Sequence, residues 1–396
     1  MPAVHALVWV FAVVAVLATI PALLEILFLT VGAALPRREL VGNGSPHRRL
    51  AVVIPAHNEA GSIQKCVLSI AASFPVPANY QVVVVADNCS DETAALAAEA
   101  GARVLVRTDP NHRGKGYALA YAFDRLRAEG LEDFLVIDAD SEVSSNLLHE
   151  VSERLGAGAP AVQCRYRVAA LANSGRARLM DAAFLAFNVL RPKGRSGWGL
   201  SAGILGNGFG LRSETLRKVP YTAASIVEDL EYHLELVAAS ASVAFINNAT
   251  VYGEIPAGGD AARSQRSRWE GGRLRIAREW IPRLTRGVTH GQWRLLEPLL
   301  DLLTLPLAYQ VLLLLLLLAT PLRAYGAAGL AVVAMHVIGA AFLGGHPGKT
   351  ILSLATAPFY ILWKVTTLHS VIFASRRGAT WVRTERDREA GLKPAR

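Results

Sequence analysis

Two acidic pairs in the sequence have the composition of a catalytic or metal-binding site. Asp138 and Asp140 form a DxD motif directly after the apolar segment 134–137. Two carboxylates one residue apart at a strand end can project toward one site, and a divalent cation that also binds diphosphate oxygens relieves their repulsion. A DxD is weak evidence alone, because many turns contain two aspartates. With the other segments described below, it predicts a metal and diphosphate site at Asp138 and Asp140.

The second acidic pair, Glu228-Asp229, lies at the expected start of a helix. Such a pair usually complements the helix dipole, but it can also supply a carboxylate that deprotonates an acceptor hydroxyl. Farther along, the segment 265–269 (QRSRW) offers an amide, a guanidinium and an indole. Arg268 can stabilise charge on a diphosphate leaving group, and Trp269 can stack against a sugar or an acceptor. The alternative for this segment is a basic amphipathic surface near a membrane.

Polar residues also follow the other expected strands. The loop 55–59 (PAHNE) leaves the first strand, where a nucleoside could dock, and Asp87 ends the second strand, where it could accept hydrogen bonds from a base or ribose. Lys115, in the flexible loop 113–116 (RGKG), could pair with a phosphate. Taken alone, this loop is better explained as a solvated turn.

The elements that position these residues have the pattern of an α/β fold. Short apolar runs at 50–55, 81–86, 103–107 and 134–137 predict buried strands, and helices are expected from 62, from 92 and over 117–128. Alternating strands and helices indicate a mostly parallel sheet, which binds ligands beyond the carboxyl ends of its strands. The absence of a GxGxxG sequence after the first strand argues against a dinucleotide-binding domain.

Taken in order, the motifs PAHNE, Asp87, DAD, VED and QRSRW resemble those of the family-2 membrane glycosyltransferases, which include cellulose, hyaluronan and chitin synthases and ceramide glucosyltransferases. The resemblance is close over about residues 50–269 and extends to the membrane segments only in general layout. It implies a cytoplasmic GT-A-type, Rossmann-like domain with a mostly parallel sheet, joined to N- and C-terminal transmembrane helices. Two departures, VED in place of TED and GNGFG in the acceptor stretch, argue against a cellulose-type polymerase.

The resemblance also implies a role for each matching residue. Asp229 is expected to be the general base beside Glu228, and Asp138 and Asp140 are expected to serve the diphosphate and its Mg²⁺ or Mn²⁺. Arg268 is expected to stabilise the leaving group, as part of a QxxRW motif. The residues expected to bind the UDP-sugar donor are Pro55, Ala56, Asn58, Glu59, Asp87, Lys115, Asp138, Gln265 and Trp269. Those expected beside the acceptor are Asn207, Gly208, Phe209 and Trp269.

These roles predict an inverting transfer of a hexose or N-acetylhexosamine from a UDP-sugar to a lipid or lipid-linked acceptor at the cytoplasmic membrane face. One alternative is a processive exopolysaccharide synthase acting with partner subunits or as a homo-oligomer. A polymer pore normally needs several helices around a polar path, and the few crossings expected here are mostly Leu, Ala, Val and Gly. The alternative from another class is an inactive membrane scaffold.

Apolar segments at both ends of the chain predict a multi-pass protein of the cell (inner) membrane. The expected order is a transmembrane helix at 1–34, the catalytic domain at 48–278 and an interfacial segment at 279–301. A transmembrane hairpin at 302–345, an interfacial or transmembrane helix at 349–374 and a basic tail at 375–396 follow. Arginines after the first segment and in the tail place the domain and the tail in the cytoplasm.

Composition excludes several other classes. The net charge of +9 is explained by charges flanking the membrane segments, and no basic stripe interleaved with aromatics indicates nucleic-acid binding. Cys66, Cys89 and Cys164 contain no CxxC pair, so neither a disulfide framework nor a zinc site is expected. A transporter is disfavoured because no crossing is expected to carry a buried charge pair. Glu25 is expected to serve helix packing or to mark a boundary.

Overall fold

The computed structural model describes residues 2–36, 48–76, 79–169, 175–223, 225–254, 259–345, 347–358 and 361, with the backbone alone for 175–177 and 259–267. The described chain forms two compact units. A sheet unit contains all the strands with helices α2–α5, α8 and α9. A helical unit contains α1, α6, η1, α7, the part of α10 from Arg266 on, and the helices that follow it.

The sheet unit is built on one eight-stranded sheet with the order β3-β2-β1-β4-β7-β6-β8-β5. Strands β1, β2, β3 and β4 run parallel to one another, whereas β7 is antiparallel to both β4 and β6. Strand β8 is parallel to β6 and antiparallel to β5. The strand bounds are β1 (Leu50–Ala56), β2 (Tyr80–Asp87), β3 (Arg103–Arg107), β4 (Asp133–Val136), β5 (Ser141–Val143), β6 (Ala161–Val168), β7 (Phe209–Arg212) and β8 (Val243–Gly253).

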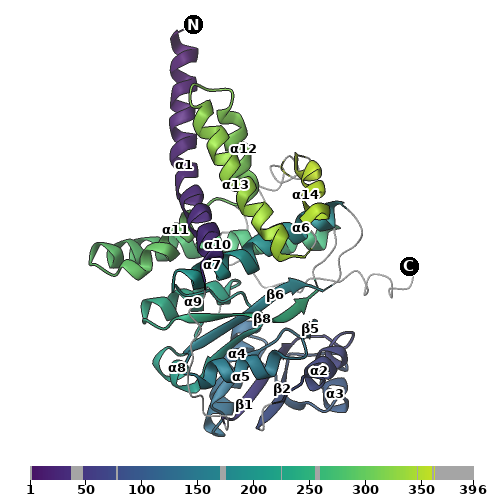
Figure 1. Cartoon of the computed structure of the whole chain (residues 1–396). Helices are drawn as coiled ribbons and strands as arrows, with labels where there is room; N and C mark the ends of the chain where they lie inside the picture. Colours follow the sequence, from purple (N-terminus) through teal and green to yellow (C-terminus); the bar gives the residue numbers. More distant parts are fainter. Residues whose placement is uncertain are drawn as a thin grey trace. The chain divides into compact units, whose positions relative to one another are not determined.

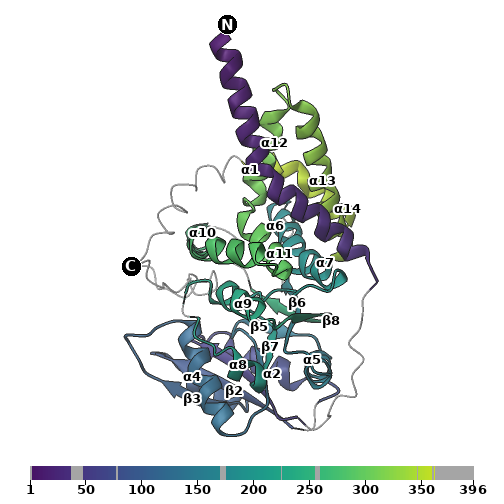
Figure 2. The ribbon, with the colours of Figure 1, turned by 90° about the vertical axis from the view of Figure 1, so that its left-hand side faces the viewer.

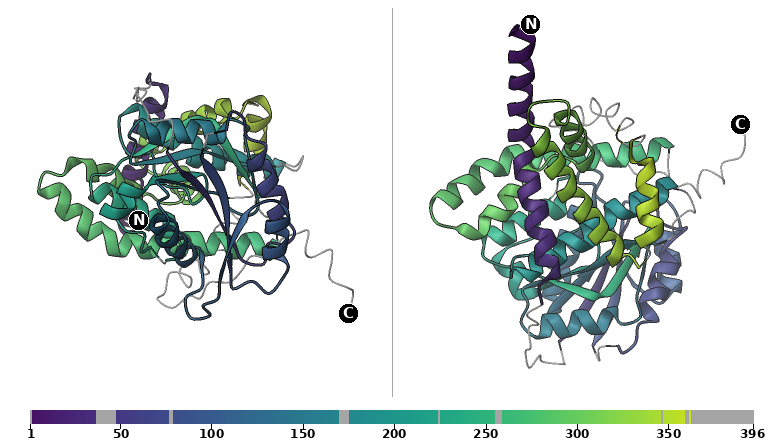
Figure 3. Two further views of the ribbon diagram at one scale, coloured as in Figure 1. Left: turned by 90° about the horizontal axis from the view of Figure 1, so that it is seen from below. Right: turned by 45° about the horizontal axis from the view of Figure 1, so that its top comes forward.

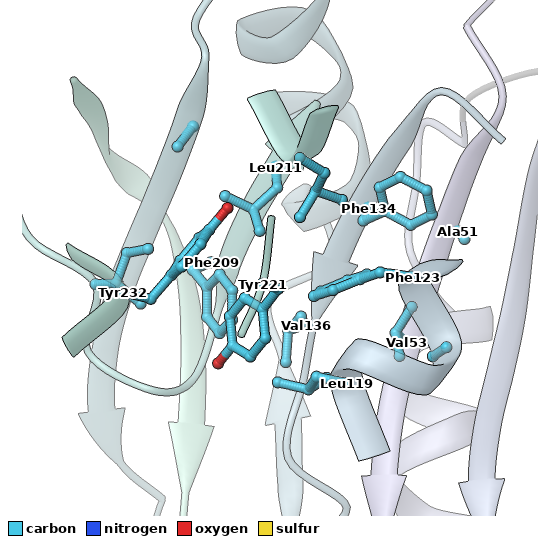
Figure 4. Close-up of a cluster of buried hydrophobic side chains, with 14 of the residues drawn as sticks. Ala51, Val53, Leu119, Phe123, Phe134, Val136, Phe209, Leu211, Tyr221 and Tyr232 are labelled. Carbon is cyan, nitrogen blue, oxygen red and sulfur yellow. The ribbon is translucent and has the colours of Figure 1, made fainter. Parts of the chain in front are cut away.

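Helices cover both faces of this sheet (Figure 2). The helix bounds are α2 (Ile63–Ala71), α3 (Thr93–Glu99), α4 (Lys115–Ala128), α5 (Leu147–Gly156), α8 (Ser213–Lys218) and α9 (Glu228–Ala238). Alternate strand residues face α4, α8 and α9 on one side and α2, α3 and α5 on the other. On the first side Phe123 packs edge-on against Phe134 and Tyr221, with ring centroids 5.3 Å apart in each pair (Figure 4). Side chains of β1, β4 and β7 pack together in this core, which fixes the positions of these three strands relative to one another.

The first four strands and first three helices lie where the sequence predicts them, within about two residues. Their parallel pairing brings the carboxyl ends of β1, β2 and β4 to one edge of the sheet, as expected. Strands β5 to β8 were not predicted. Strand β6 (AVQCRYRV) contains three polar residues and β7 has only four residues, so neither shows the apolar run on which the prediction relied.

In the helical unit, α12 (Leu307–Leu317) and α13 (Arg323–Leu343) form a hairpin beside α1 (Pro2–Ala34) (Figure 1; Figure 3, right). Polar side chains join these helices: Thr19 hydroxyl lies 2.9 Å from that of Tyr325, and Gln310 donates to the Thr19 carbonyl at 2.8 Å. Such hydrogen bonds stabilise helix pairs in an apolar environment.

Two helices of the described chain, α1 and α13, are long and apolar enough to cross a membrane. The first half of the predicted hairpin at 302–345 is not continuous, because α11 (Leu296–Leu303) ends before Pro306 and α12 begins after it. The helices Trp293–Leu303 and Leu307–Leu317 are bent by 74°, and they add a third candidate only if they count as one broken span. Most of the predicted interfacial or transmembrane helix at 349–374 lies outside the described residues; α14 (Pro347–Ser353) begins just before it.

One segment of the predicted catalytic domain groups with the helical unit instead. It contains α6 (Gly175–Leu185), the π-helical turn η1 (Ala186–Leu190) and α7 (Arg191–Gly197). Helix α7 packs closely on α1, where a Cβ at Gly194 would overlap the carbonyl of Leu29. Trp198 stacks on Phe28 of α1, with centroids 4.8 Å apart, and donates to its carbonyl at 2.8 Å. Sequence patterns missed this because 191–197 (RPKGRSG) has no apolar stripe.

Candidate active site

The DxD motif follows β4 directly, and its first carboxylate is bound by a lysine. Lys115, the first residue of α4, donates to Asp138 Oδ1 at 2.5 Å and also to the carbonyl of Gly206. The lysine therefore joins the DxD turn to the segment that leads into β7. Burial acts to lower the pKa of Lys115, but Asp138 and Glu228 outweigh it, so the pKa is raised and the ammonium stays charged.

The turn before β7 is held by two buried amides. Asn207 Oδ1 accepts from the backbone N–H of Asp138 at 3.1 Å, and Asn207 Nδ2 donates to the Ser141 hydroxyl at 2.8 Å. Gln163 of β6 donates to the Asn207 carbonyl at 2.8 Å and accepts from the N–H of Leu205 at 2.9 Å. This network fixes the DxD turn from both sides. Gln163 was missed by sequence reasoning, although a glutamine inside an apolar strand is a usable signal.

The second acidic pair begins α9 and lies against the same turn. A Cβ at Gly206, whose φ is +77°, would lie 3.1 Å from Asp229 Oδ2, so only glycine lets the carboxylate approach so closely. Burial, together with the neighbouring Asp229, raises the pKa of Glu228 to about 8. Burial also raises the pKa of Asp229, opposed by the N–H of Leu230 and by Lys115. The structure therefore brings together the DxD aspartate, Lys115 and the acidic pair, as the sequence predicted for one site.

On the donor side, the loops after β1 and β2 are joined to each other. Asn58 accepts from the N–H of Ser90 at 2.7 Å, and Glu59 N–H donates to the Thr93 hydroxyl at 2.7 Å. Asp87 is buried and forms an ion pair of 2.6 Å with Arg107 of β3. Arg107 was not predicted as a site residue. It neutralises one oxygen of Asp87 and so orients the carboxylate expected to meet the nucleoside.

Tyr166 of β6 is a third residue of this region, after Gln163 and Arg107, that the sequence did not predict. A Cβ at Gly253 would lie 2.6 Å from the Tyr166 hydroxyl oxygen. The same phenolic oxygen is hydrogen-bonded to the Asn207 side chain. Burial, Asp138 and Asp140 all raise the pKa of Tyr166. The hydroxyl therefore stays protonated close to the DxD motif, and no spacing in the sequence indicated this.

The residues present fit a divalent cation of the Mg²⁺ type. Asp138 and Asp140 are half-buried, and the Ser141 hydroxyl lies 3.4 Å from Asp140 Oδ1. Among the described residues, no group of three or more His, Cys, Asp or Glu could hold a metal ion. Mg²⁺ commonly binds one or two carboxylates and takes its other ligands from phosphates and water, so two aspartates suffice only when a diphosphate is bound as well.

The residues predicted beside the acceptor are divided by the structure. Gly208, with φ +71°, and Asn207 are both buried in the turn before β7, and the Asn207 amide belongs to the network described above. Phe209 is fully buried and packs in the core between the sheet and α9 (Figure 4). Its ring therefore cannot contact an acceptor, because the alternation of β7 points it inward. The acceptor prediction for Phe209 is corrected accordingly.

The QxxRW residues lie on α10 (Gly259–Thr289). Gln265, Arg268 and Trp269 are spaced three and four residues apart, which places them on one face of this helix. Trp269 is 47% exposed and Arg268 is half-buried. The side chain of Gln265 lies outside the described part of the structure.

Two protein-family models match the chain. Residues 51–214 match glycosyl transferase family 2, and residues 134–366 match glycosyl transferase family group 2. The chain is 42% identical over 80 residues to the low-salt glycan biosynthesis hexosyltransferase Agl6 of Haloferax volcanii, which covers 20% of this chain and 19% of Agl6. It is 24% identical over 244 residues to the probable glycosyltransferase YdaM of Bacillus subtilis, covering 59% of this chain and 57% of YdaM. The chain thus matches less than two thirds of either relative.

A solved structure shares the fold over most of the chain. The mannosyltransferase PcManGT from Pyrobaculum calidifontis, solved with GDP-Man and Mn²⁺, aligns over 90% of this chain and 99% of its own, with a TM-score of 0.52 and 16% identity. This likeness supports the predicted GT-A-type fold. Since the second family match covers more than half of the 396 residues, the chain belongs to glycosyl transferase family group 2 and is a glycosyltransferase.

Proposed function

We propose that this protein transfers a hexose or N-acetylhexosamine from a UDP-sugar to a lipid or lipid-linked acceptor, with inversion at the anomeric carbon. The observation that carries the proposal is the convergence of the DxD turn, Lys115 and Asp229 on the carboxyl edge of the sheet. Lys115 bonds both Asp138 and the Gly206 carbonyl, and Asp229 lies against Gly206. Asp138, expected to serve the donor diphosphate, and Asp229, expected to deprotonate the acceptor, are thereby held close to the same turn.

The donor site is assigned to the loops after β1, β2 and β4. Pro55, Ala56, Asn58 and Glu59 would lie beside the nucleoside, and Asp87, oriented by Arg107, would accept its hydrogen bonds. Asp138 and Asp140 would hold Mg²⁺ or Mn²⁺, which when bound neutralises charge on the diphosphate. The likeness to PcManGT, solved with GDP-Man and Mn²⁺, adds a guanosine donor to those that need testing.

In this mechanism Asp229 accepts the proton of the acceptor hydroxyl as that oxygen attacks the anomeric carbon. Burial raises the pKa of Asp229, which strengthens the carboxylate as a base while Lys115 keeps it ionised. Glu228 stays protonated near neutral pH, because its pKa is about 8, and it therefore adds no second negative charge beside the base. Arg268 and Gln265 are assigned to the leaving diphosphate, and Trp269 to the sugar or acceptor.

The acceptor is assigned to the membrane because α1 and α13 could each cross a bilayer. In this proposal the sheet unit faces the cytoplasm of a cell membrane and the product carries one or a few sugars. Asn207, whose buried amide binds Asp138 and Ser141, would support the turn beside the acceptor rather than contact the acceptor. A lipid acceptor also suits Trp269, whose exposed indole is typical of side chains at a membrane surface.

The test uses purified protein in nanodiscs with a total lipid extract, Mg²⁺ or Mn²⁺, and a panel of UDP-sugars plus GDP-mannose. Nucleotide release is measured for the wild type, Asp140→Asn, Asp229→Asn and the control Glu142→Gln. Glu142 lies two residues from the DxD but pairs on the surface with Lys65. We expect Asp229→Asn to lose about 10²–10⁴-fold in rate while it still binds nucleotide. We expect Asp140→Asn to lose metal-dependent nucleotide binding, and the control to match the wild type.

Three results would contradict parts of the proposal. An α-linked product, detected by NMR, would exclude a single displacement. A long ladder of products would show a processive synthase. Nucleotide binding that is independent of metal, and unchanged in Asp140→Asn, would show that the DxD is not the donor site.

A further inference from the structure

A group of six charged side chains, five of them buried and one partly exposed, lies in the helical unit. We call it the ionic cluster; its members are Glu25, Arg191, Arg195, Arg273, Glu297 and Asp301. Three acids and three arginines balance one another. They come from four helices, α1, α7, α10 and α11. The sequence predicted no buried charge pair in a membrane segment; the ion pair of Glu25 with Arg191 shows that this prediction is wrong.

Asp301 is the residue that connects the others. Arg191 of α7 donates to Asp301 Oδ1 and also to Glu25 of α1. Arg273 of α10 lies 3.1 Å from Asp301 Oδ1 and 3.3 Å from Oδ2, and it donates to the Asp301 carbonyl as well. Through this one carboxylate, α10 is bonded to α11 and, by way of Arg191, to α1.

Helix α11 buries acidic side chains and exposes leucines, the reverse of the usual pattern for a helix in water. It buries Glu297 and Asp301, each 7% exposed, while Leu296 and Leu303 are about 40% exposed. Acids that point inward persist when they are paired with arginines, because an unpaired buried charge is strongly unfavourable. Charge pairs are directional and leave little freedom of rotation, so they specify one arrangement of the helices.

The connection to catalysis runs along α10. Arg273 follows Trp269 by four residues and Arg268 by five, so it lies about one turn, roughly 6 Å, farther along the same helix. Anchoring Arg273 therefore sets both the rotation of α10 about its axis and its height along that axis. A slip of one residue would turn the QxxRW face by about 100°.

We infer that the ionic cluster positions the QxxRW helix: Arg273, bound to Asp301, holds Arg268 and Trp269 in their working orientation relative to α1 and α11. Arg273 is thus a positioning residue that acts through Arg268. The inference rests on the proposed function insofar as Arg268 and Trp269 serve the reaction there. The inference also assigns a role to Glu25 of α1: through Arg191 and Asp301 it links α1 to α10.

A double-mutant cycle tests the inference in the full-length protein in nanodiscs. The variants are Arg268→Ala, Arg273→Gln and the two combined. We expect Arg273→Gln to lower kcat roughly tenfold with a donor KM within about twofold of wild type. In the Arg268→Ala background the same change should cost clearly less activity than it does alone, because only Trp269 is then left for Arg273 to position.

Glu297→Gln is the matched control. Glu297 is as buried as Asp301 and forms an ion pair of 2.5 Å with Arg195, yet no hydrogen bond or ion pair described for it reaches α10. We expect this variant to lose thermal stability while keeping kcat within about threefold. If Arg273→Gln is too unstable to purify, Arg273→Lys keeps the charge without the two-pronged guanidinium, and we expect it to show a smaller loss of kcat.

Hydrogen exchange of α10 supplies a readout that does not depend on activity. We expect amides of 268–276 to exchange at least several-fold faster in Arg273→Gln and Asp301→Asn, but not in Glu297→Gln. Equal exchange in all the variants, equal loss of kcat in Arg273→Gln and Glu297→Gln, or multiplicative losses in the cycle would each overturn the inference. The two proposals can fail separately. If α10 exchanges faster in Arg273→Gln but the wild type turns over no sugar donor, the anchoring role of Arg273 stands and the proposed function is refuted.

Discussion

Folding strongly changes the ionisation of Glu228. It lies in a buried pair with Asp229, next to Lys115 and Asp138, and these surroundings raise its pKa to about 8 from an ordinary 4.5. Two adjacent buried carboxylates cannot both ionise cheaply, so one keeps its proton and the other is free to act as a base. The positive charge of Lys115 interacts favourably with Asp138 and with both carboxyl groups of the acidic pair.

This arrangement makes a prediction for stability against pH. Between about pH 4.5 and 8 the folded protein binds the Glu228 proton more tightly than the unfolded chain does. The contribution of Glu228 to the free energy of unfolding is therefore complete at low pH and is lost as the pH rises through about 8. We expect Glu228→Gln, which mimics the protonated acid, to be more stable than the wild type at pH 9 by roughly 1–3 kcal/mol.

The measurement is thermal unfolding in detergent from pH 5 to pH 9. The advantage of Glu228→Gln over the wild type should grow with pH and level off above about 8. Glu231→Gln, on the same helix, is the control, and it should show no such growth. A pH-independent difference between Glu228→Gln and the wild type would show that Glu228 is already ionised in the folded protein.

At the level of elements, the closest helix contact is that of α7 with α1. Gly194 and Gly197 of α7 lie against the backbone of Leu29 and Gly32, and Trp198 closes the contact by stacking on Phe28. Small residues let helix backbones approach closely, which increases dispersion contacts where the hydrophobic effect is weak. The contact also brings Arg191 of α7 within reach of Glu25.

We predict that Gly194→Val separates α7 from α1 and destabilises the helical unit by about 2–4 kcal/mol, because the added side chain overlaps the Leu29 carbonyl. Thermal unfolding in nanodiscs measures the change. Gly61→Ala is the control, since nothing lies within 4 Å of a Cβ at Gly61, and it should shift Tm little. Equal Tm values for the two variants would mean that α7 is not held against α1.

For the whole molecule, the sheet unit is proposed to work on the cytoplasmic side of a membrane that α1 crosses. Arg48 and Arg49 support that orientation through the positive-inside rule. Arg48 has a second task, since its guanidinium holds Asp133 of β4 at 2.8 and 2.7 Å. Asp133 thus partly neutralises Arg48, so most of the positive charge that follows α1 comes from Arg37, Arg38 and Arg49.

Cysteine labelling in intact cells tests this topology. In a Cys89→Ser background, Val4→Cys lies at the exposed start of α1 and Lys65→Cys on the exposed face of the sheet unit. We expect a membrane-impermeant maleimide to label Val4→Cys in intact cells and Lys65→Cys only after lysis. Labelling of Lys65→Cys in intact cells would place the catalytic unit outside.

The sequence alone was sufficient for the first half of the catalytic fold and for the donor motifs. Apolar runs ending in polar residues located β1, β2 and β4, and parallel pairing then required Asp87 and the DxD to share one edge. The acidic pair and the QxxRW spacing were equally visible, because each is a short motif whose chemistry depends on adjacent residues. Local periodicity and short spacing carry this kind of information.

Only the tertiary structure decided which polar groups meet. Lys115 was predicted as a phosphate ligand, but folding places it on Asp138 and the Gly206 carbonyl, 91 residues away. Arg107, Gln163 and Tyr166 entered the site through strand pairing, and Phe209 left it because the register of β7 turns its ring into the core. The partnership of Glu25 with Arg191, 166 residues apart, is likewise set by helix packing. Contacts between residues far apart in the chain depend on the whole packed arrangement, and no local pattern records them.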